Sequence, residues 1–154
     1  MSSTDLTSPV IHLVDDDAAV REALSLLIGT VGLRTQSWDN PLAFLAGFAR
    51  DAIGAIVLDV RMPGLSGLSV VDQLREQGAD QPVIVLTGHG TVDLCRRAFK
   101  SGVAEFLEKP VNDDQLLDAV QAAVRSHVLN RQRDSGGRDA RERYARLSPR
   151  EKDV

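Results

Sequence analysis

The sequence predicts an α/β fold built on a doubly wound parallel sheet. Four short apolar runs are bounded by polar or turn-forming residues, and stretches with helical periodicity separate them. Continuous apolar runs of this length are typical of strands that are buried on both faces of a parallel sheet. The runs cover residues 10–14, 55–58, 83–86 and 105–108.

Two helices and a fifth strand fit between the first two runs. Apolar residues at helical spacing over residues 20–31 predict a helix, and Gly32 follows where a C-cap glycine is expected. Residues 34–38 predict a short strand. Asn40 and Pro41 then supply an N-cap and a first helical residue for the second helix. Strand and helix therefore alternate from the start of the chain.

Three further helices are predicted where a polar residue precedes apolar residues at helical spacing. These polar residues are Ser66, Thr91 and Asn112. Gly78 and Gly102 lie where the third and fourth helices should stop. The sequence thus predicts five helices in all.

Five polar residues follow the predicted strands at their carboxyl ends. Asp15 and Asp16 follow the first run, and Asp59, Thr87 and Lys109 follow the other three. In an open parallel sheet, the carboxyl ends of the strands form the crevice where ligands bind. We therefore expect three carboxylates, a hydroxyl and an ammonium group to meet in one pocket, although they are far apart in the sequence.

Four sequence strings contain these residues: HLVDDDAAVR, VLDVRMPGLSG, VIVLTGHG and FLEKP. Together, and in this order, they resemble the response-regulator receiver domain of two-component systems, in particular its FixJ-like branch. The resemblance covers residues 8–130. It implies a flavodoxin-like, five-stranded parallel sheet in the order 2-1-3-4-5 with five flanking helices. It also implies that the chain accepts a phosphoryl group from a sensor histidine kinase.

By this resemblance, Asp59 is the phosphorylated residue and Mg²⁺ is the cofactor. Asp16, Asp59 and the backbone carbonyl of Arg61 are expected to bind the metal directly, and Asp15 through water, while Asp17 points away. A hard divalent cation neutralises the charge on an attacking carboxylate and on phosphoryl oxygens. The domain is then a phosphoacceptor rather than an enzyme, and it assists only its own phosphorylation and dephosphorylation.

Three further residues have roles that the resemblance implies. Lys109 would place its ammonium group beside Asp59, and the Lys109–Pro110 peptide bond would be cis, although the sequence leaves the isomer open. Thr87 would bind the phosphoryl group, and Phe106 would enter the space that the moving loop vacates. This switch is expected to change the face formed by the fourth helix, the fifth strand and the fifth helix, and to promote homodimerisation.

Residues around this site are expected to set its kinetics and its partner. Met62 and His89 flank the phosphorylation site and are expected to tune the rate of dephosphorylation. His89 is alternatively a metal ligand or a general base. Kinase choice is expected to depend on the first helix, around Val20, Ala23 and Leu24.

Two other functions compete with the receiver assignment. A phosphatase of the haloacid dehalogenase class needs a second aspartate two residues after its nucleophile, where this chain has Arg61. A phosphorylation-independent interaction module normally lacks one of the five site residues, and this chain has all five. Phosphoryl incorporation would separate the three readings.

Composition limits the class of protein. The chain has 154 residues, enough for one domain with a core and a short additional segment. Its single cysteine excludes an internal disulfide, and no apolar stretch approaches the roughly 18 residues of a membrane span. The N-terminal residues lack the basic region and apolar core of a signal peptide. A cytoplasmic location without membrane attachment is therefore expected.

The balance of charged residues changes sign near residue 125. Residues 1–124 carry 9 Lys and Arg against 17 Asp and Glu, a balance of −8, and residues 125–154 carry 9 against 5, a balance of +4. The expected organisation is a disordered N-terminus (1–7), a receiver domain (8–124) whose last helix extends to about 130, a linker (131–146) and a C-terminal segment (147–154).

The C-terminal segment, residues 147–154, resembles the start of a LuxR-type helix-turn-helix domain. Ser148 would be the N-cap, Pro149 the first helical residue and Glu151 the third, which together form a capping box. The chain would then be truncated, and it would bind DNA and regulate transcription only through the missing C-terminal domain. The alternative is a disordered tail that happens to contain Ser-Pro-x-Glu.

Overall fold

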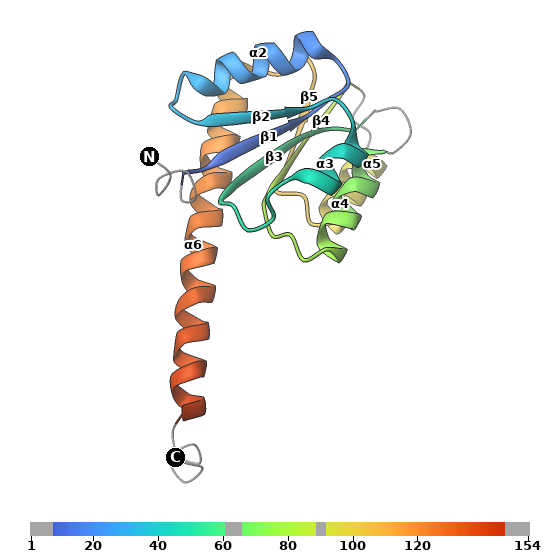
Figure 1. Cartoon of the computed structure of the whole chain (residues 1–154). Helices are drawn as coiled ribbons and strands as arrows, with labels where there is room; N and C mark the ends of the chain where they lie inside the picture. The colour runs from blue at the N-terminus through green and yellow to red at the C-terminus, as the bar shows by residue number, and fades with distance from the viewer. Residues whose placement is uncertain (1–7, 61–65, 89–91, 147–154) are drawn as a thin grey trace.

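The computed structural model describes residues 8–60, 66–88 and 92–146, with side chains as far as residue 133. Within these residues, strands and helices alternate and form one sheet with helices on both faces (Figure 1). The elements are β1 (Val10–Val14), α2 (Ala18–Gly29), β2 (Arg34–Trp38), α3 (Pro41–Gly47), β3 (Gly54–Asp59), α4 (Gly67–Glu76), β4 (Val83–Thr87), α5 (Val92–Lys100), β5 (Glu105–Glu108) and α6 (Asp113–Arg146).

The five strands are parallel and lie in the order β2-β1-β3-β4-β5. This order, together with the helices between the strands, confirms the flavodoxin-like fold expected from the sequence. β3 and β4 are buried at every position because they lie inside the sheet with helices on both faces. β2 and β5 form the two edges of the sheet and keep exposed residues.

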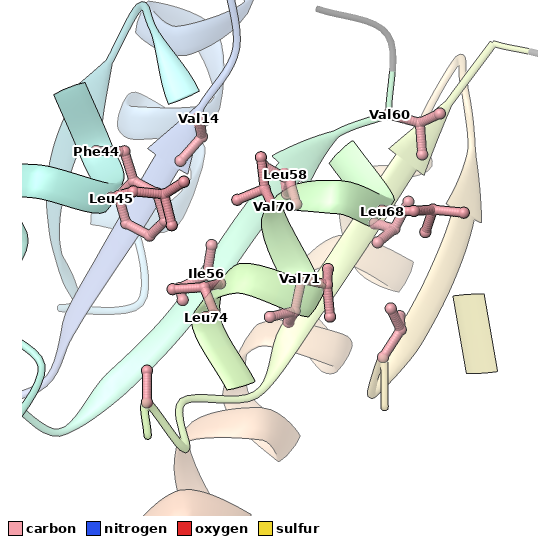
Figure 2. Close-up of a cluster of buried hydrophobic side chains, with 14 of the residues drawn as sticks. Val14, Phe44, Leu45, Ile56, Leu58, Val60, Leu68, Val70, Val71 and Leu74 are labelled. Carbon is pink, nitrogen blue, oxygen red and sulfur yellow. The ribbon is translucent and has the colours of Figure 1, made fainter. Parts of the chain in front are cut away.

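Two apolar clusters cover the two faces of the sheet. One contains Phe44 of α3 and Leu74 of α4, and the other contains Leu116 of α6. Neighbouring residues of β3 divide between them, with Leu58 in the first cluster and Val57 in the second, because successive strand side chains point to opposite faces. Figure 2 shows the first cluster, in which side chains of α3 and α4 meet those of β1 and β3.

Capping residues begin four of the helices. The side chains of Asn40, Ser66 and Asn112 accept hydrogen bonds from backbone N–H groups in the first turns of α3, α4 and α6. Asp17 caps α2 in the same way. These caps confirm the starts predicted for α3, α4 and α6. Thr91, the polar residue predicted to precede α5, lies outside the described residues.

The first helix ends slightly earlier than its apolar spacing predicts. α2 ends at Gly29, and residues 30–32 continue as turns in which each N–H donates to the carbonyl three residues before it. Gly32 then adopts a φ of 81°, a left-handed conformation that favours glycine, and leads the chain into β2.

The last helix is longer than predicted. α6 continues to Arg146 instead of ending near residue 130, and its C-terminal half extends away from the sheet (Figure 1). Apolar periodicity fades there because that half has no sheet to pack on. The helix passes through Gly136 and Gly137, which each cost about 1 kcal/mol relative to alanine, and continues through 138–146, where Arg, Ala and Glu favour helix. The assignment of 131–146 as a linker remains a prediction, and residues 147–154 lie outside the described residues.

α6 is fastened to the amino ends of the strands by polar contacts. His127 Nδ1 accepts a hydrogen bond from the Gly54 N–H (3.1 Å), so His127 Nε2 carries the proton and donates to Asp80 Oδ1 at 3.0 Å. Arg131 donates to both carboxylate oxygens of Asp80, at 2.8 and 2.9 Å, and to the carbonyl of Asp51 at 2.9 Å. In the part of the chain that the structure describes, no helix is both long and apolar enough to cross a membrane.

Candidate functional site

Three carboxylates meet at the carboxyl ends of β1 and β3. One carboxylate oxygen from each of Asp15, Asp16 and Asp59 lies within 4.8 Å of the other two. The pairing of Val14 with Leu58 sets this convergence, because Asp15 and Asp59 are the next residues on the two strands. Asp15 and Asp59 are buried and Asp16 is exposed. Because like charges repel at this distance, the cluster calls for a cation.

Lys109 supplies one cation to this cluster. Its Nζ lies 3.3 Å from Asp59 Oδ2 and 3.6 Å from Asp15 Oδ2. Lys109 follows β5 directly, and its N–H donates to the Thr87 carbonyl at 2.7 Å, which continues the pairing of β5 with β4. The Lys109–Pro110 peptide bond is cis. Lys109 thus neutralises part of the charge on two buried carboxylates.

One buried oxygen of the cluster has no hydrogen bond from the residues that the structure describes. Asp15 Oδ1 accepts from the Asp17 N–H at 2.9 Å, but Asp15 Oδ2 is buried without a hydrogen-bond donor. Burial raises the pKa of the Asp15 carboxyl above its ordinary value, while the Asp17 N–H and the Lys109 ammonium act in the opposite direction. An acceptor in this condition can be satisfied by water held on a metal ion, so the donor set of three carboxylates fits a hard cation such as Mg²⁺.

Asp17 does not belong to the cluster. Its carboxylate accepts from the Ala19 N–H at 2.9 Å and caps α2, so the third aspartate of the acidic string has a structural role. This agrees with the expectation that Asp17 points away from the metal.

Thr87 and Phe106 occupy neighbouring positions on the two last strands. Thr87 is completely buried at the end of β4. Phe106 pairs with Val85, and Thr87 lies two residues beyond Val85, so Thr87 and Phe106 share one face of the sheet. Phe106 is half-buried and packs against the cluster that contains Val85.

Gly67 is a site residue that sequence reasoning missed. Its N–H donates to the Val60 carbonyl at 2.9 Å, which brings the start of α4 against the end of β3. A Cβ at Gly67 would lie 2.7 Å from the Asp59 carbonyl oxygen and 2.8 Å from Val60 Cα. The position of Asp59 thus depends on the absence of a side chain at residue 67. In the sequence, this requirement is indicated only by the glycine that follows the Ser66 cap.

Three of the predicted site residues lie outside the described residues. These are Arg61, Met62 and His89. Their roles in metal binding and dephosphorylation remain predictions.

An open pocket adjoins the site on the side of α2. It has a volume of about 410 Å³, and Val20, Ala23 and Leu24 of α2 form one wall while Lys109 and Pro110 form another. The residues expected to influence kinase choice therefore line a surface that reaches the cation of the acidic cluster.

Comparison with known proteins agrees with this combination of fold and site. A parallel sheet in this order binds ligands at the carboxyl ends of its strands, where this chain places its acidic residues and a lysine. The family model described as response regulator receiver domain matches residues 11–121. This chain belongs to the response regulator receiver domain family.

Curated relatives and solved structures support the same family. The transcriptional regulatory protein FixJ of Azorhizobium caulinodans is 46% identical over 146 residues, which are 94% of this chain and 68% of that protein. Response regulator protein TodT of Pseudomonas putida strain F1 is 39% identical over 94% of this chain and 64% of that protein. The solved structure of response regulator StyR has a TM-score of 0.87 and 33% identity over 95% of this chain and 74% of that chain.

The chain spans about two thirds of the length of such curated relatives. These relatives are a response regulator and a transcriptional regulatory protein by name.

Proposed function

We propose that this chain is a phosphoacceptor whose Asp59 receives a phosphoryl group from a sensor histidine kinase. The observation that carries the proposal is the convergence of Asp15, Asp16, Asp59 and Lys109 at one edge of the sheet. An oxygen of Asp59 forms a bond to phosphorus while the bond from the donor's nitrogen to phosphorus breaks, and the donor leaves with that electron pair. Lys109 then holds a phosphoryl oxygen instead of the free carboxylate.

The metal of this reaction would be Mg²⁺, held by Asp16, Asp59 and the carbonyl of Arg61, with Asp15 acting through water. When bound, Mg²⁺ would neutralise the charge of the carboxylates and of the phosphoryl oxygens. The exposed Asp16 and the buried Asp15 suit these different roles, since the buried oxygen of Asp15 accepts no hydrogen bond from the described residues and could accept one from a metal-bound water.

The output of phosphorylation would be a change at the face formed by α5, β5 and α6. Thr87 would donate to a phosphoryl oxygen, and Phe106 would shift toward the space that this movement opens. α5 exposes apolar surface at Val92 and Phe99, which are 75% and 54% accessible. Such surface supports the formation of a homodimer on this face.

The partners follow from the same proposal. The kinase would dock at the pocket between α2 and Lys109, where Val20, Ala23 and Leu24 present apolar surface next to the acceptor. Transcription would be regulated by a DNA-binding domain that follows the receiver domain. The basic residues after 124 and the LuxR-like segment 147–154 support this arrangement. The cytoplasmic location expected from the sequence belongs to the same proposal.

The direct test is phosphoryl incorporation from a small acyl-phosphate donor with Mg²⁺, measured by intact mass. The wild-type chain should take up one phosphoryl group, and Asp59→Asn should take up none while its thermal unfolding remains cooperative. Asp39→Asn removes an exposed carboxylate outside the cluster and is the matched control. Incorporation by Asp59→Asn would refute the assignment. Rapid repeated turnover by the wild type would indicate a phosphatase, and no incorporation a phosphorylation-independent module.

A further inference from the structure

Arg21 holds the turn that carries two of the three aspartates. Arg21 lies one turn into α2, and its Nη1 donates to the backbone carbonyl of Asp15 at 2.6 Å. The same turn is fixed at two other points, because the Asp15 N–H donates to the Trp38 carbonyl at 3.1 Å and the Asp17 N–H donates to Asp15 Oδ1 at 2.9 Å. Of these three hydrogen bonds, the one from Arg21 is the one donated by a side chain.

This contact fixes one particular peptide plane. The carbonyl of Asp15 and the N–H of Asp16 belong to the same planar unit, so holding the carbonyl also sets the direction in which Asp16 leaves the strand. Asp16 is exposed, whereas Asp15 and Asp59 are buried. The backbone of Asp16 must therefore orient its carboxylate toward the cluster.

We propose that Arg21 is a positioning residue for the metal site, because it fixes the peptide between Asp15 and Asp16 so that the Asp16 carboxylate faces Asp59. The inference rests on the proposed Mg²⁺ site and names a residue that acts on that site without touching the metal. Asp17 also contributes to this arrangement, because it caps the start of α2 and so determines where Arg21 lies.

Charge and geometry predict opposite effects when Arg21 is removed. Arg21 is a cation beside an acidic cluster, so simple electrostatics predicts that Arg21→Met strengthens Mg²⁺ binding by removing repulsion of the dication. Positioning predicts that the same variant weakens binding, as loss of a group that orients a metal ligand usually does, by roughly tenfold. The sign of the change therefore separates the two effects.

The experiment is a Mg²⁺ titration of the metal-binding chain and its variants by calorimetry. Arg34→Met is the matched control. It removes the same charge and a similar bond, from Arg34 Nη2 to the Ser8 carbonyl at 3.2 Å, at the opposite end of the sheet.

The expected result is weaker Mg²⁺ binding by roughly tenfold in Arg21→Met, unchanged binding in Arg34→Met, and a smaller loss in Arg21→Lys, which keeps the charge but not the guanidinium geometry. Phosphorylation of Arg21→Met should recover at saturating Mg²⁺, since only the affinity is lost. Equal or tighter binding by a folded Arg21→Met would overturn the inference. If the wild type itself bound no Mg²⁺, the proposed function would fail instead. If Arg21→Met proved unfolded, Arg21→Lys would decide the question by the same criterion.

Discussion

The ammonium group of Lys109 lies 3.3 Å from a carboxylate oxygen of Asp59, although 50 residues separate the two along the chain. The contact forms because Asp59 ends β3 and Lys109 follows β5, with β4 between them. A second carboxylate, that of Asp15, lies 3.6 Å from the same ammonium group. Within the residues that the structure describes, one ammonium group thus lies within 4 Å of two buried carboxylates, and the close approach of three carboxylates suits a metal ion.

Asp16→Asn should weaken Mg²⁺ binding by roughly tenfold or more, because a hard cation would lose an anionic ligand. Calorimetric titration measures this. Asp17→Asn is the matched control, since it removes the neighbouring charge while asparagine still caps α2. Wild-type affinity in Asp16→Asn would remove this residue from the proposed metal site.

Gly67→Ala should destabilise the fold by about 1 to 3 kcal/mol and slow phosphorylation, because the new Cβ would meet backbone atoms of Asp59 and Val60 that cannot move aside alone. Urea unfolding measures the stability. Gly29→Ala is the control, as a Cβ at this helical glycine has no neighbouring atom within 4 Å and should stabilise by about 0.5 to 1 kcal/mol. Equal stability of Gly67→Ala and wild type would show that the close approach is not required.

Asp80→Asn should lower stability at neutral pH and lose this effect in acid. Hydrogen bonds from Arg131 and then from His127 lower the pKa of the Asp80 carboxyl to about 2, against the opposing effect of burial. A depressed pKa means that the ionised form stabilises the fold above about pH 4, and that this contribution disappears as the pH falls toward 2. The carboxylate is 42% exposed, so solvent screening limits the contribution to about 1 kcal/mol.

Urea unfolding of Asp80→Asn and wild type at several pH values between 7 and about 2.5 tests the contact between Asp80 and α6. The difference in unfolding free energy should be largest near neutrality and should shrink below about pH 4. Asp72→Asn on α4 changes an exposed carboxylate elsewhere and should show no such trend. A difference that is independent of pH would contradict an ionic contribution from Asp80.

A beryllofluoride mimic of the phosphoryl group should convert the chain to a dimer, and Phe99→Glu should prevent this. The reason is that Phe99 exposes apolar surface on α5, within the face proposed for dimerisation. Sedimentation with and without the mimic measures the mass. Leu26→Glu introduces the same change on α2, where Leu26 is 70% exposed, and should leave the dimer intact. Loss of the dimer in Leu26→Glu alone would place the interface on α2.

Local patterns in the sequence predicted most of the fold. Apolar runs marked four strands, and the caps Asn40, Ser66 and Asn112 marked helix starts, because capping and side-chain periodicity depend on neighbours within a few residues. The predicted end of the last helix, near residue 130, was wrong for the same reason. Apolar periodicity measures packing on the sheet, so it could not detect the helix that continues beyond the sheet to Arg146.

The sequence by itself determined which chemical groups this protein brings to its site, because Asp15, Asp16, Asp59 and Lys109 each lie at or just after the carboxyl end of a strand, and the carboxyl ends of parallel strands lie together. Only the tertiary structure decided which of these groups contact one another. The Lys109 contact with two carboxylates, the buried oxygen of Asp15 without a donor and the close approach of Gly67 all depend on strand register and helix packing. These are distances between segments remote in the chain, and no local pattern of residues encodes them.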